Sequence, residues 1–503
     1  MRKKNHQFYI TTSIAYVNAL PHIGFALELV QADVLARYRR LVGNDVYFLT
    51  GTDEHGAKIV KAAEAAGLKP QIFASQNAKK YQELGEKLNI SNDAFIRTSD
   101  QKKHWPSVKN FWLKLVKNGD IYKKNYQGLY CVGHEAFITK KDLVNGKCPD
   151  HNVSPEAVRE ENYFFRLTRY AKKIESKIKK DELKIIPTGR KNEILKFIKQ
   201  GLEDISFSRP RKDLSWGIPV PDDKTQTVYV WADALVNYIS ALGFPKNKLF
   251  KKYWPADIHL IGKDISRFHA VIWPAMLLSA RLALPKSIFV HGHILADGKK
   301  MSKTLSNVID PFDVIERYGV DALRYWLLRD IPTAGDGDFT YEKFIERYNG
   351  DLAKGLGNLV ARVSRLASSK NKIQAEKIDP AFNKEIKTVW RQYKKEMENF
   401  NFHKTLGSIW RFIGFCDRYI DKNKPWELLK SKNSRFDQVM LNLLYGLSEI
   451  GWLLMPFLPE TAEKIFLQIG LNPAHKKSWL KFGFKPKYIK PLFPHLDHRL
   501  PAQ

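Results

Sequence analysis

The chain has 503 residues, of which 44% are hydrophobic and 12% aromatic. This composition excludes an intrinsically disordered chain and is typical of two to four domains, each with its own core. Lys and Arg outnumber Asp and Glu by 83 to 53, a formal net charge of +30, which favours a polyanionic partner or a membrane surface without choosing between them.

The sequence contains no run of about 18 uncharged apolar residues, the length that a membrane-spanning helix needs. We therefore expect no signal peptide, no anchor and no membrane partner. The cysteines Cys131, Cys148 and Cys416 are too few for a disulfide framework, which predicts a reducing, cytoplasmic compartment.

The first predicted element is a βαβ unit, with apolar strand-like runs at 8–17 and 46–49 on either side of a helical stretch at 25–41. Similar runs, each followed by a helical pattern, recur at 258–261 and 288–290. The predicted fold class is therefore α/β, with a doubly wound, Rossmann-like parallel sheet built from two separated halves.

The predicted domain order follows from these elements and from the places where strand-like and helical hydrophobic patterns replace one another. The two halves of the catalytic domain are 1–117 and 226–328, separated by a connective insertion at 118–225 that holds a lysine-dense, solvated helix at 172–184. A linking segment at 329–350, an all-α helical-bundle domain at 351–470 and a tail at 471–503 complete the chain.

Two motifs together indicate a nucleotide site. His22-Ile23-Gly24 opens the first helix, where free backbone N–H groups and the helix dipole receive phosphate. Lys300-Met301-Ser302-Lys303-Thr304 follows the run at 288–290 and places two ammonium groups in one loop. Taken alone, the first motif is more typical of a structural turn and the second of an exposed basic loop. Taken together and in this order, the two motifs resemble the paired signatures of class I aminoacyl-tRNA synthetases.

Four further segments narrow the resemblance to methionyl-tRNA synthetase. They are Ala15-Tyr16-Val17-Asn18, Gly51-Thr52-Asp53-Glu54-His55-Gly56, Tyr229-Val230-Trp231-Ala232-Asp233-Ala234 and Ile261-Gly262-Lys263-Asp264. The resemblance continues through the helical domain to Leu492-Phe493-Pro494, almost the whole chain. One residue departs from it: the family's first signature usually ends in His or Asn, and here Phe25 removes that polar contact.

The resemblance implies an ATP-dependent ligase that forms methionyl-adenylate, releases pyrophosphate and transfers methionine to the 3′-terminal ribose of initiator and elongator methionine tRNAs. The expected reactants are L-methionine and ATP with Mg²⁺. The implied catalytic residues are His22, Lys300 and Lys303, and the further ATP contacts are Gly24, Asp264 and Ser302. An exposed helix cap is the other interpretation of Asp264.

Two alternatives stay open. One is a tRNA-binding or regulatory paralogue that has lost ligase activity, which is favoured only by Phe25. The other is the same chemistry on another amino acid, such as leucine or cysteine, and the environment of Trp231 and Tyr238 argues against cysteine.

That pocket is also implied by the resemblance. A thioether is polarisable and only a weak acceptor, so aromatic walls and one or two donors suit it. Tyr238 is implied to lie near the sulfur and Asp53 to pair with the ammonium group. The complete set is Ile14, Tyr16, Asp53, Trp231, Ala234, Leu235, Tyr238, Phe268, His269 and Trp273. By position alone, Trp231, Trp273 and His269 are equally compatible with an ordinary core.

The pairs Cys131/His134 and Cys148/His151 each enclose two residues, with thirteen residues between the pairs. This spacing predicts a tetrahedral, structural zinc site in the insertion, one ion per chain, with a metal-free remnant as the other reading.

The resemblance places anticodon recognition at Asn358, Arg362, Pro425 and Trp426 of the helical domain. An aromatic side chain at a helix start can stack on an unpaired base. A surface salt bridge for Arg362 and core burial for Trp426 are the other readings. The chain shows no obvious appended tRNA-binding module, so we expect a monomer.

Overall fold

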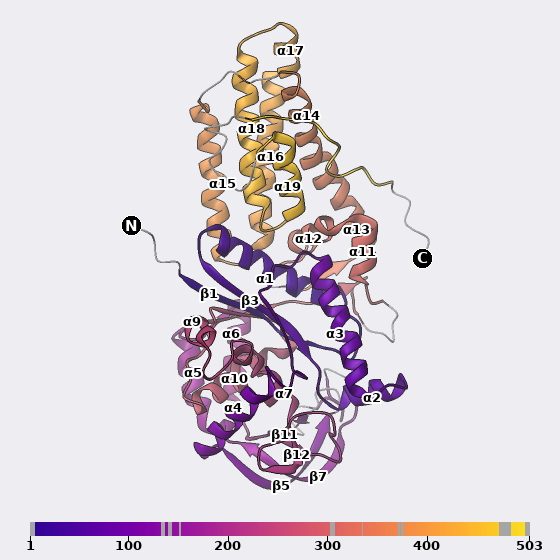
Figure 1. Ribbon diagram of the computed structural model, residues 1–503, viewed down its shortest axis with the longest axis vertical. Helices are drawn as coiled ribbons and strands as arrows, with labels where there is room; N and C mark the ends of the chain where they lie inside the picture. Colours follow the sequence, from indigo (N-terminus) through magenta and orange to yellow (C-terminus); the bar gives the residue numbers. More distant parts are fainter. Residues whose placement is uncertain are drawn as a thin grey trace. The chain divides into compact units, whose positions relative to one another are not determined.

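The computed structural model describes residues 6–131, 136–138, 143–149, 152–301, 307–333, 335–370, 373, 377–471 and 484–497 (Figure 1). The chain divides into two compact units. Unit 1 comprises Met1–Pro21, Val42–Glu86 and Ser91–His291, and unit 2 comprises His22–Leu41, Lys87–Ile90 and Gly292–Gln503. Within the described part of the chain, no helix has the length and apolar character that crossing a membrane requires.

Unit 1 is built on a parallel sheet with strand order β2-β3-β1-β13-β14-β8, and β4 also pairs with β3. The strands are β1 Gln7–Thr12, β2 Ala15–Tyr16, β3 Asp45–Asp53, β4 Ala94–Arg97, β8 Lys184–Ile186, β13 Ile258–Gly262 and β14 Ser287–His291. Ile10 of β1 lies between Phe48 of β3 and Ile258 of β13. All neighbouring strands of this sheet pair in parallel. The prediction that two separated segments complete one parallel sheet is confirmed.

The helices of unit 1 follow the hydrophobic periodicity of the sequence. In α4, Val108, Phe111, Trp112 and Leu115 recur at helical spacing and are all buried in one core with residues of β1, β3, β13 and β14. The helical segments of this unit are α2 Ala57–Ala65, α3 Pro70–Lys87, α4 Trp105–Lys117, α5 Ala171–Lys179, α6 Thr188–Lys199, α7 Val230–Ala234, α8 Asn237–Ser240, α9 Lys248–Tyr253, η2 Leu167–Tyr170, η3 Lys263–Ile265, η4 Phe268–Ile272 and α10 Trp273–Ser279.

Two small antiparallel sheets occupy the predicted insertion at 118–225, and one strand of the second, β12, continues three residues beyond it. The first has the order β6-β5-β7-β9, and the second β10-β12-β11. Their strands are β5 Ile121–Cys131, β6 Ala136–Ile138, β7 Glu156–Phe165, β9 Ile205–Ser206, β10 Ser208–Pro210, β11 Pro219–Val220 and β12 Asp223–Val228. One strand of the same stretch, β8, instead extends the parallel sheet by pairing with β14.

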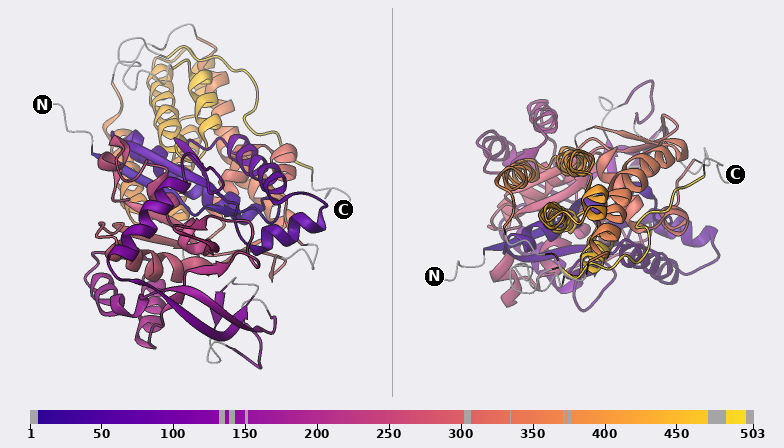
Figure 2. Two further views of the ribbon diagram at one scale, coloured as in Figure 1. Left: turned by 60° about the horizontal axis from the view of Figure 1, so that its bottom comes forward. Right: turned by 90° about the horizontal axis from the view of Figure 1, so that it is seen from above.

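Unit 2 contains the predicted helical domain, which is confirmed. Its helices α15, α16, α18 and α19 pack against one another in sequence and are seen nearly end-on in the right view of Figure 2. The elements are α1 Ile23–Leu41, β15 Ile294–Ala296, β16 Lys299–Lys300, α11 Pro311–Tyr318, α12 Val320–Arg329, β17 Gly337–Phe339, α13 Tyr341–Arg347, η6 Tyr348–Gly357, α14 Asn358–Ala367, α15 Pro380–Glu398, α16 Phe402–Asn423, α17 Pro425–Lys430, α18 Arg435–Leu454 and α19 Pro459–Ile469. The predicted βαβ order is present, although α1 groups with unit 2 and its two flanking strands with unit 1.

Candidate active site

The first nucleotide signature lies at the start of α1. The Nδ1 atom of His22 accepts a hydrogen bond from the Gly24 N–H at 3.1 Å, and the His22 carbonyl accepts from the Phe25 and Ala26 N–H groups. Because Nδ1 accepts, the neutral ring carries its proton on Nε2, an N–H donor suited to phosphate. Desolvation, together with the nearby His293, lowers the pKa of His22, so the neutral form is favoured at pH 7.

The missing Cβ at the third position of this signature leaves room for the His22 ring. A Cβ on Gly24 would lie 2.9 Å from both Cε1 and Nδ1 of His22, closer than real Cβ contacts allow. The next residue, Phe25, has 9% of its surface exposed. Its side chain therefore packs in the interior and offers a nucleotide no polar group.

The second signature lies partly outside the described residues. Lys300 ends β16, which forms a hairpin with β15, whereas Ser302 and Lys303 are not described. The Ile23 N–H donates to the carbonyl oxygen of Ile309 at 3.2 Å. The structure thus joins the first signature to the chain segment that follows the second signature.

In unit 1, predicted site residues gather at the carboxyl ends of adjacent strands. Asp53 ends β3, Ile14 follows β1, and Asp264 lies in η3 directly after β13. Ligands of open parallel sheets bind at this edge. Asp53 is buried and accepts a hydrogen bond from Thr98 Oγ1 at 3.3 Å. Asp264 is exposed, and Gly262, not Asp264, occupies the cap position of η3.

The predicted aromatic residues of the methionine pocket lie together. Trp231 stacks on Phe268 with ring centroids 3.8 Å apart and planes 8° apart, and His269 meets Trp231 edge-on at 6.2 Å. Tyr238 lies between His269 and Trp273, at 5.7 and 6.0 Å. Trp231 and Phe268 remain partly exposed, as do Ile14 and Tyr16, which pack on the same core; the buried members are Ala234, Leu235, Tyr238, His269 and Trp273.

A hydrogen-bond chain fixes the polar side of this cluster. The Nδ1 atom of His269 lies 2.9 Å from the carbonyl oxygen of Ile265, which can only accept, so Nδ1 carries the proton. Nε2 then accepts from the Tyr238 hydroxyl at 2.6 Å. Because that hydroxyl proton is used within the protein, Tyr238 offers a thioether an aromatic surface and not a hydroxyl donor.

One support of the cluster was missed in the sequence. The ring of His259, in the apolar strand β13, lies 4.1 Å from the Tyr238 ring. Its Nε2 faces the Trp273 indole N–H at 3.3 Å and its Nδ1 faces Thr11 Oγ1 at 2.8 Å. Burial, followed by the proximity of His269, lowers the pKa of His259 well below its ordinary value. A polar residue in a buried strand was the available signal.

A second missed group surrounds the carboxylate of Asp233 on α7. His55 Nδ1 and His104 Nε2 each lie 2.7 Å from one of its oxygens, and all three residues are buried. Burial acts to raise the pKa of Asp233, but the two histidines outweigh it and the pKa is lowered. The cluster ties α7, which carries Trp231, to the segment after Asp53. Both His55 and Asp233 fall in segments that carry the resemblance, but neither was assigned a role.

In the helical domain, Trp426 is the second residue of α17 and has 36% of its surface exposed, so it is not a core residue. The Arg362 guanidinium lies 6.0 Å from its ring centroid and 2.8 Å from Asp421. The salt-bridge reading of Arg362 therefore holds, and it coexists with the contact to Trp426. Asn358 is exposed one helical turn before Arg362, and Pro425 is buried.

Among the described residues, no group of three or more His, Cys, Asp or Glu side chains is arranged to hold a metal ion. Cys131 and Cys148 are both buried. The other two predicted ligands, His134 and His151, lie outside the described residues.

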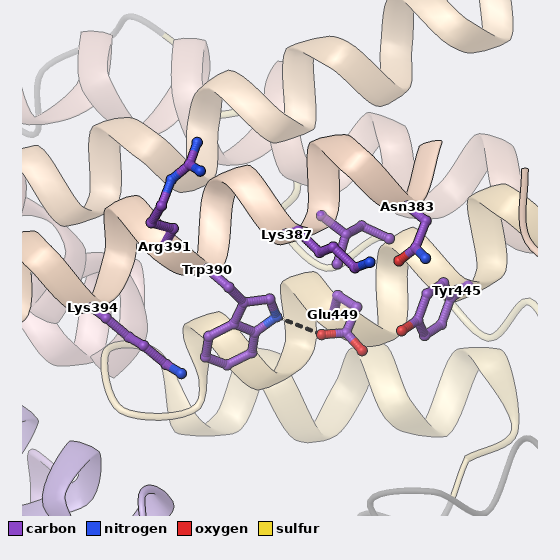
Figure 3. A pocket seen from close by; sticks show the side chains of 8 residues that line it. Asn383, Lys387, Trp390, Arg391, Lys394, Tyr445 and Glu449 are labelled. Carbon is purple, nitrogen blue, oxygen red and sulfur yellow. Dashed lines mark hydrogen bonds between the residues drawn. The ribbon is translucent and has the colours of Figure 1, made fainter. Parts of the chain in front are cut away.

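A groove of about 580 Å³ lies between α15 and α18 (Figure 3). The Trp390 indole N–H donates to Glu449 at 2.6 Å in its centre. The lining residues are Asn383, Ile386, Lys387, Trp390, Arg391, Lys394, Tyr445 and Glu449. None of them belongs to the predicted catalytic, methionine or anticodon sets, so this groove marks none of those sites.

Comparisons with known proteins agree with this geometry. Residues 8–157 and 141–364 match the family described as "tRNA synthetases class I (M)", and residues 379–491 match "Anticodon-binding domain of tRNA ligase". The chain is 43% identical to the methionine–tRNA ligase of Caldanaerobacter subterraneus subsp. tengcongensis, over 97% of this chain and 79% of that protein. It is 43% identical to the methionine–tRNA ligase of Brucella suis, over 94% of this chain and 93% of that protein.

Among solved structures, Mycobacterium tuberculosis methionyl-tRNA synthetase in complex with methionyl-adenylate superposes with a TM-score of 0.92. Its sequence is 36% identical, and the match covers 97% of this chain and 100% of that one. Sequence relatives of this similarity, over nearly full length, share one fold and one reaction class. The chain belongs to the methionyl-tRNA synthetase family of class I aminoacyl-tRNA ligases.

Proposed function

We propose that this chain joins L-methionine to methionine tRNA in two steps: formation of methionyl-adenylate with release of pyrophosphate, then transfer of methionine to the 3′-terminal ribose. The observation that carries the proposal is the partly exposed stack of Trp231 on Phe268, which His269 connects to Tyr238. Such an aromatic, largely apolar surface suits an unbranched thioether.

The methionine carboxylate supplies the nucleophile, so the protein contributes position and charge stabilisation. We assign the Nε2–H donor of His22, with Gly24, to the ATP phosphates. Lys300, Ser302 and Lys303 are assigned to the charge that develops on the phosphates, which bound Mg²⁺ would also neutralise. Asp53 is assigned to the methionine ammonium and Asp264 to the ribose side of the adenylate.

We propose Asn358, Arg362, Pro425 and Trp426 as the anticodon contacts. Support comes from the exposure of Trp426 and from Arg362 beside its ring. The proposed substrates include both initiator and elongator methionine tRNAs. We also propose that the protein is a cytoplasmic monomer and that its domains have the boundaries predicted from the sequence.

A structural zinc ion suits the donors that are described. The Asn152 N–H donates to the Cys148 carbonyl at 2.7 Å, closing a tight turn of the kind that zinc knuckles use. Cys131 and Cys148 are both buried, and we propose His134 and His151 as the remaining ligands. Metal analysis of protein purified without added zinc tests this: well under one zinc per chain would remove the proposal.

Methionine-dependent ATP–pyrophosphate exchange tests the catalytic assignment, with the wild type beside Lys303→Ala. Robust exchange with methionine alone, falling about a hundredfold or more in the variant, is the expected result. If folded wild-type protein binds tRNA but exchanges with no amino acid, the paralogue without ligase activity replaces this proposal, and Phe25 becomes the first residue to change.

A further inference from the structure

One buried arginine joins four segments of unit 2. Arg324, on α12, is fully buried. Its Nε donates to the Phe457 carbonyl at 2.8 Å and its Nη1 to the Leu88 carbonyl at 2.9 Å. Its Nη2 donates to Asp33 Oδ2 at 2.7 Å and to the Pro456 carbonyl at 3.0 Å. The guanidinium thereby connects α1, the segment Lys87–Ile90, α12 and the turn between α18 and α19.

The carboxylate that Arg324 meets is equally buried and lies in the middle of α1. Asp33 has no exposed side-chain surface and also accepts from Arg37 Nε at 2.8 Å. Arg37 in turn donates to the carbonyl and side-chain oxygens of Asn89 at 2.6 and 3.0 Å. Two arginines therefore hold Asp33 and fix this part of α1 to Lys87–Ile90.

The C-terminal end of α1 has its own attachment. Arg39 donates through both terminal nitrogens to Glu398 of α15, at 3.1 and 2.8 Å, and the Tyr38 hydroxyl donates to the same carboxylate at 3.2 Å. These hydrogen bonds and ion pairs fix the second half of α1, whereas the start of the helix carries Gly24, with His22 directly before it, and the backbone bond from Ile23 to Ile309.

A continuous α-helix transmits a change of tilt along its length. Asp33 lies ten residues after Ile23, about 15 Å at the rise of an α-helix. A small rotation at Asp33 therefore displaces the first turn, and misplacing a catalytic group by about 1 Å can reduce a rate about a hundredfold.

We propose that Arg324 and Asp33 are positioning residues for ATP: their buried ion pair sets the orientation of α1 and so the point at which His22 Nε2 meets the phosphates. The inference rests on the proposed role of His22. The methionine pocket is assembled from residues of unit 1, so the effect of breaking the pair falls on ATP and not on methionine.

Two variants test the pair by pyrophosphate exchange. Arg324→Lys keeps the charge but lacks the planar fork that reaches four acceptors, and Asp33→Asn keeps the side-chain volume but removes the charge. In each, we expect the KM for ATP to rise about tenfold or more, with the KM for methionine changed by less than about twofold. Thermal unfolding of each variant reports folding; should Arg324→Lys fail to fold, Asp33→Asn carries the test.

Arg347→Lys is the matched control. Arg347 forms a partly exposed two-bond pair with Asp330 in the same unit, at 2.9 and 2.8 Å, and its other hydrogen bond in the described part of the chain goes to Asp351 and not to α1, so both KM values should stay unchanged. Unchanged KM values in folded Arg324→Lys and Asp33→Asn, or equal rises for ATP and methionine, would overturn the inference. His22→Ala separates the two claims: if it leaves the KM and kcat for ATP intact, the role proposed for His22 fails, whatever the Arg324 variants do.

Discussion

At the scale of single residues, Gly24 makes the sharpest prediction. Adding a methyl group at Gly24 forces the His22 ring away from the helix start, since Cβ would lie 2.9 Å from two ring atoms. We expect Gly24→Ala to lower the rate of pyrophosphate exchange about ten- to a hundredfold through misplacement of the Nε2 donor, while the melting temperature changes little. Steady-state exchange kinetics and a thermal melt measure both quantities.

Gly407, inside α16, is the control for that substitution. A Cβ there meets nothing within 4 Å, so Gly407→Ala should leave exchange unchanged and stabilise the fold by about 0.5–1 kcal/mol. If Gly24→Ala also leaves the rate of pyrophosphate exchange unchanged, the position of the His22 ring does not depend on the absence of a Cβ at Gly24.

The residues predicted from the sequence were those that the family resemblance implies, such as Trp231 and Tyr238. The structure adds partners that surround them: His259 behind Tyr238, and His55 and His104 on Asp233. These were not found because a histidine inside an apolar strand or beside a turn has the same local pattern whether it packs, titrates or supports a site.

At the scale of elements, Asp321 of α12 forms a buried hydrogen bond with the start of α19. Its Oδ2 accepts from the Thr461 N–H at 2.6 Å, and its buried Oδ1 has no hydrogen-bond partner among the described residues. Burial raises the pKa of Asp321 from 3.8 to about 6. Between these values the folded protein binds a proton that the unfolded chain releases, so this group's stabilisation is present below about pH 4 and lost as pH rises through 6.

Asp321→Asn keeps an acceptor for Thr461 and removes the charge. We expect the variant to be more stable than the wild type above pH 6, by about 1–3 kcal/mol, with the difference shrinking towards pH 4. Chemical denaturation at several pH values measures the difference between the two proteins, which cancels the other titrating groups. A difference that is constant with pH would exclude this account.

The proposed base-stacking surface lies on α17. Lys424, with a left-handed φ of 45°, separates α16 from α17, and Trp426 is exposed at the start of α17. We expect Trp426→Ala to weaken aminoacylation of methionine tRNA, by about 1–3 kcal/mol in kcat/KM, with pyrophosphate exchange nearly intact. Leu467→Ala, at a side chain of 63% exposure on α19, is the control and should change neither assay. Equal loss in both assays would remove Trp426 from the anticodon site.

At the scale of the whole molecule, the net charge of +30 predicts how tRNA binding responds to salt. Contacts between basic side chains and phosphates release counterions, so the affinity should fall about tenfold or more between 50 and 200 mM salt. The KM for methionine, a net-neutral amino acid, should change little over that range. Filter binding and exchange kinetics at matched salt concentrations measure the two; a tRNA affinity independent of salt would contradict an electrostatic contact.

The sequence by itself determined the family, the parallel sheet and the C-terminal helical domain, because these are encoded in short ordered motifs and in local hydrophobic periodicity. Each of these patterns can be recognised from residues that are close in the sequence. Examples are His22-Ile23-Gly24, the apolar runs of β13 and β14, and the periodicity of the long amphipathic helices.

Only the tertiary structure decided which distant side chains meet. His55 reaches Asp233 across 178 positions, and Arg324 reaches Asp33 across 291. Such pairs form only when the tertiary fold brings together segments that are distant in the sequence, and local hydrophobic periodicity does not specify which segments meet. The tautomer of His269, the exposure of Trp426 and the placement of α1 with the helical domain are set in the same way, by neighbours that are far away in the sequence.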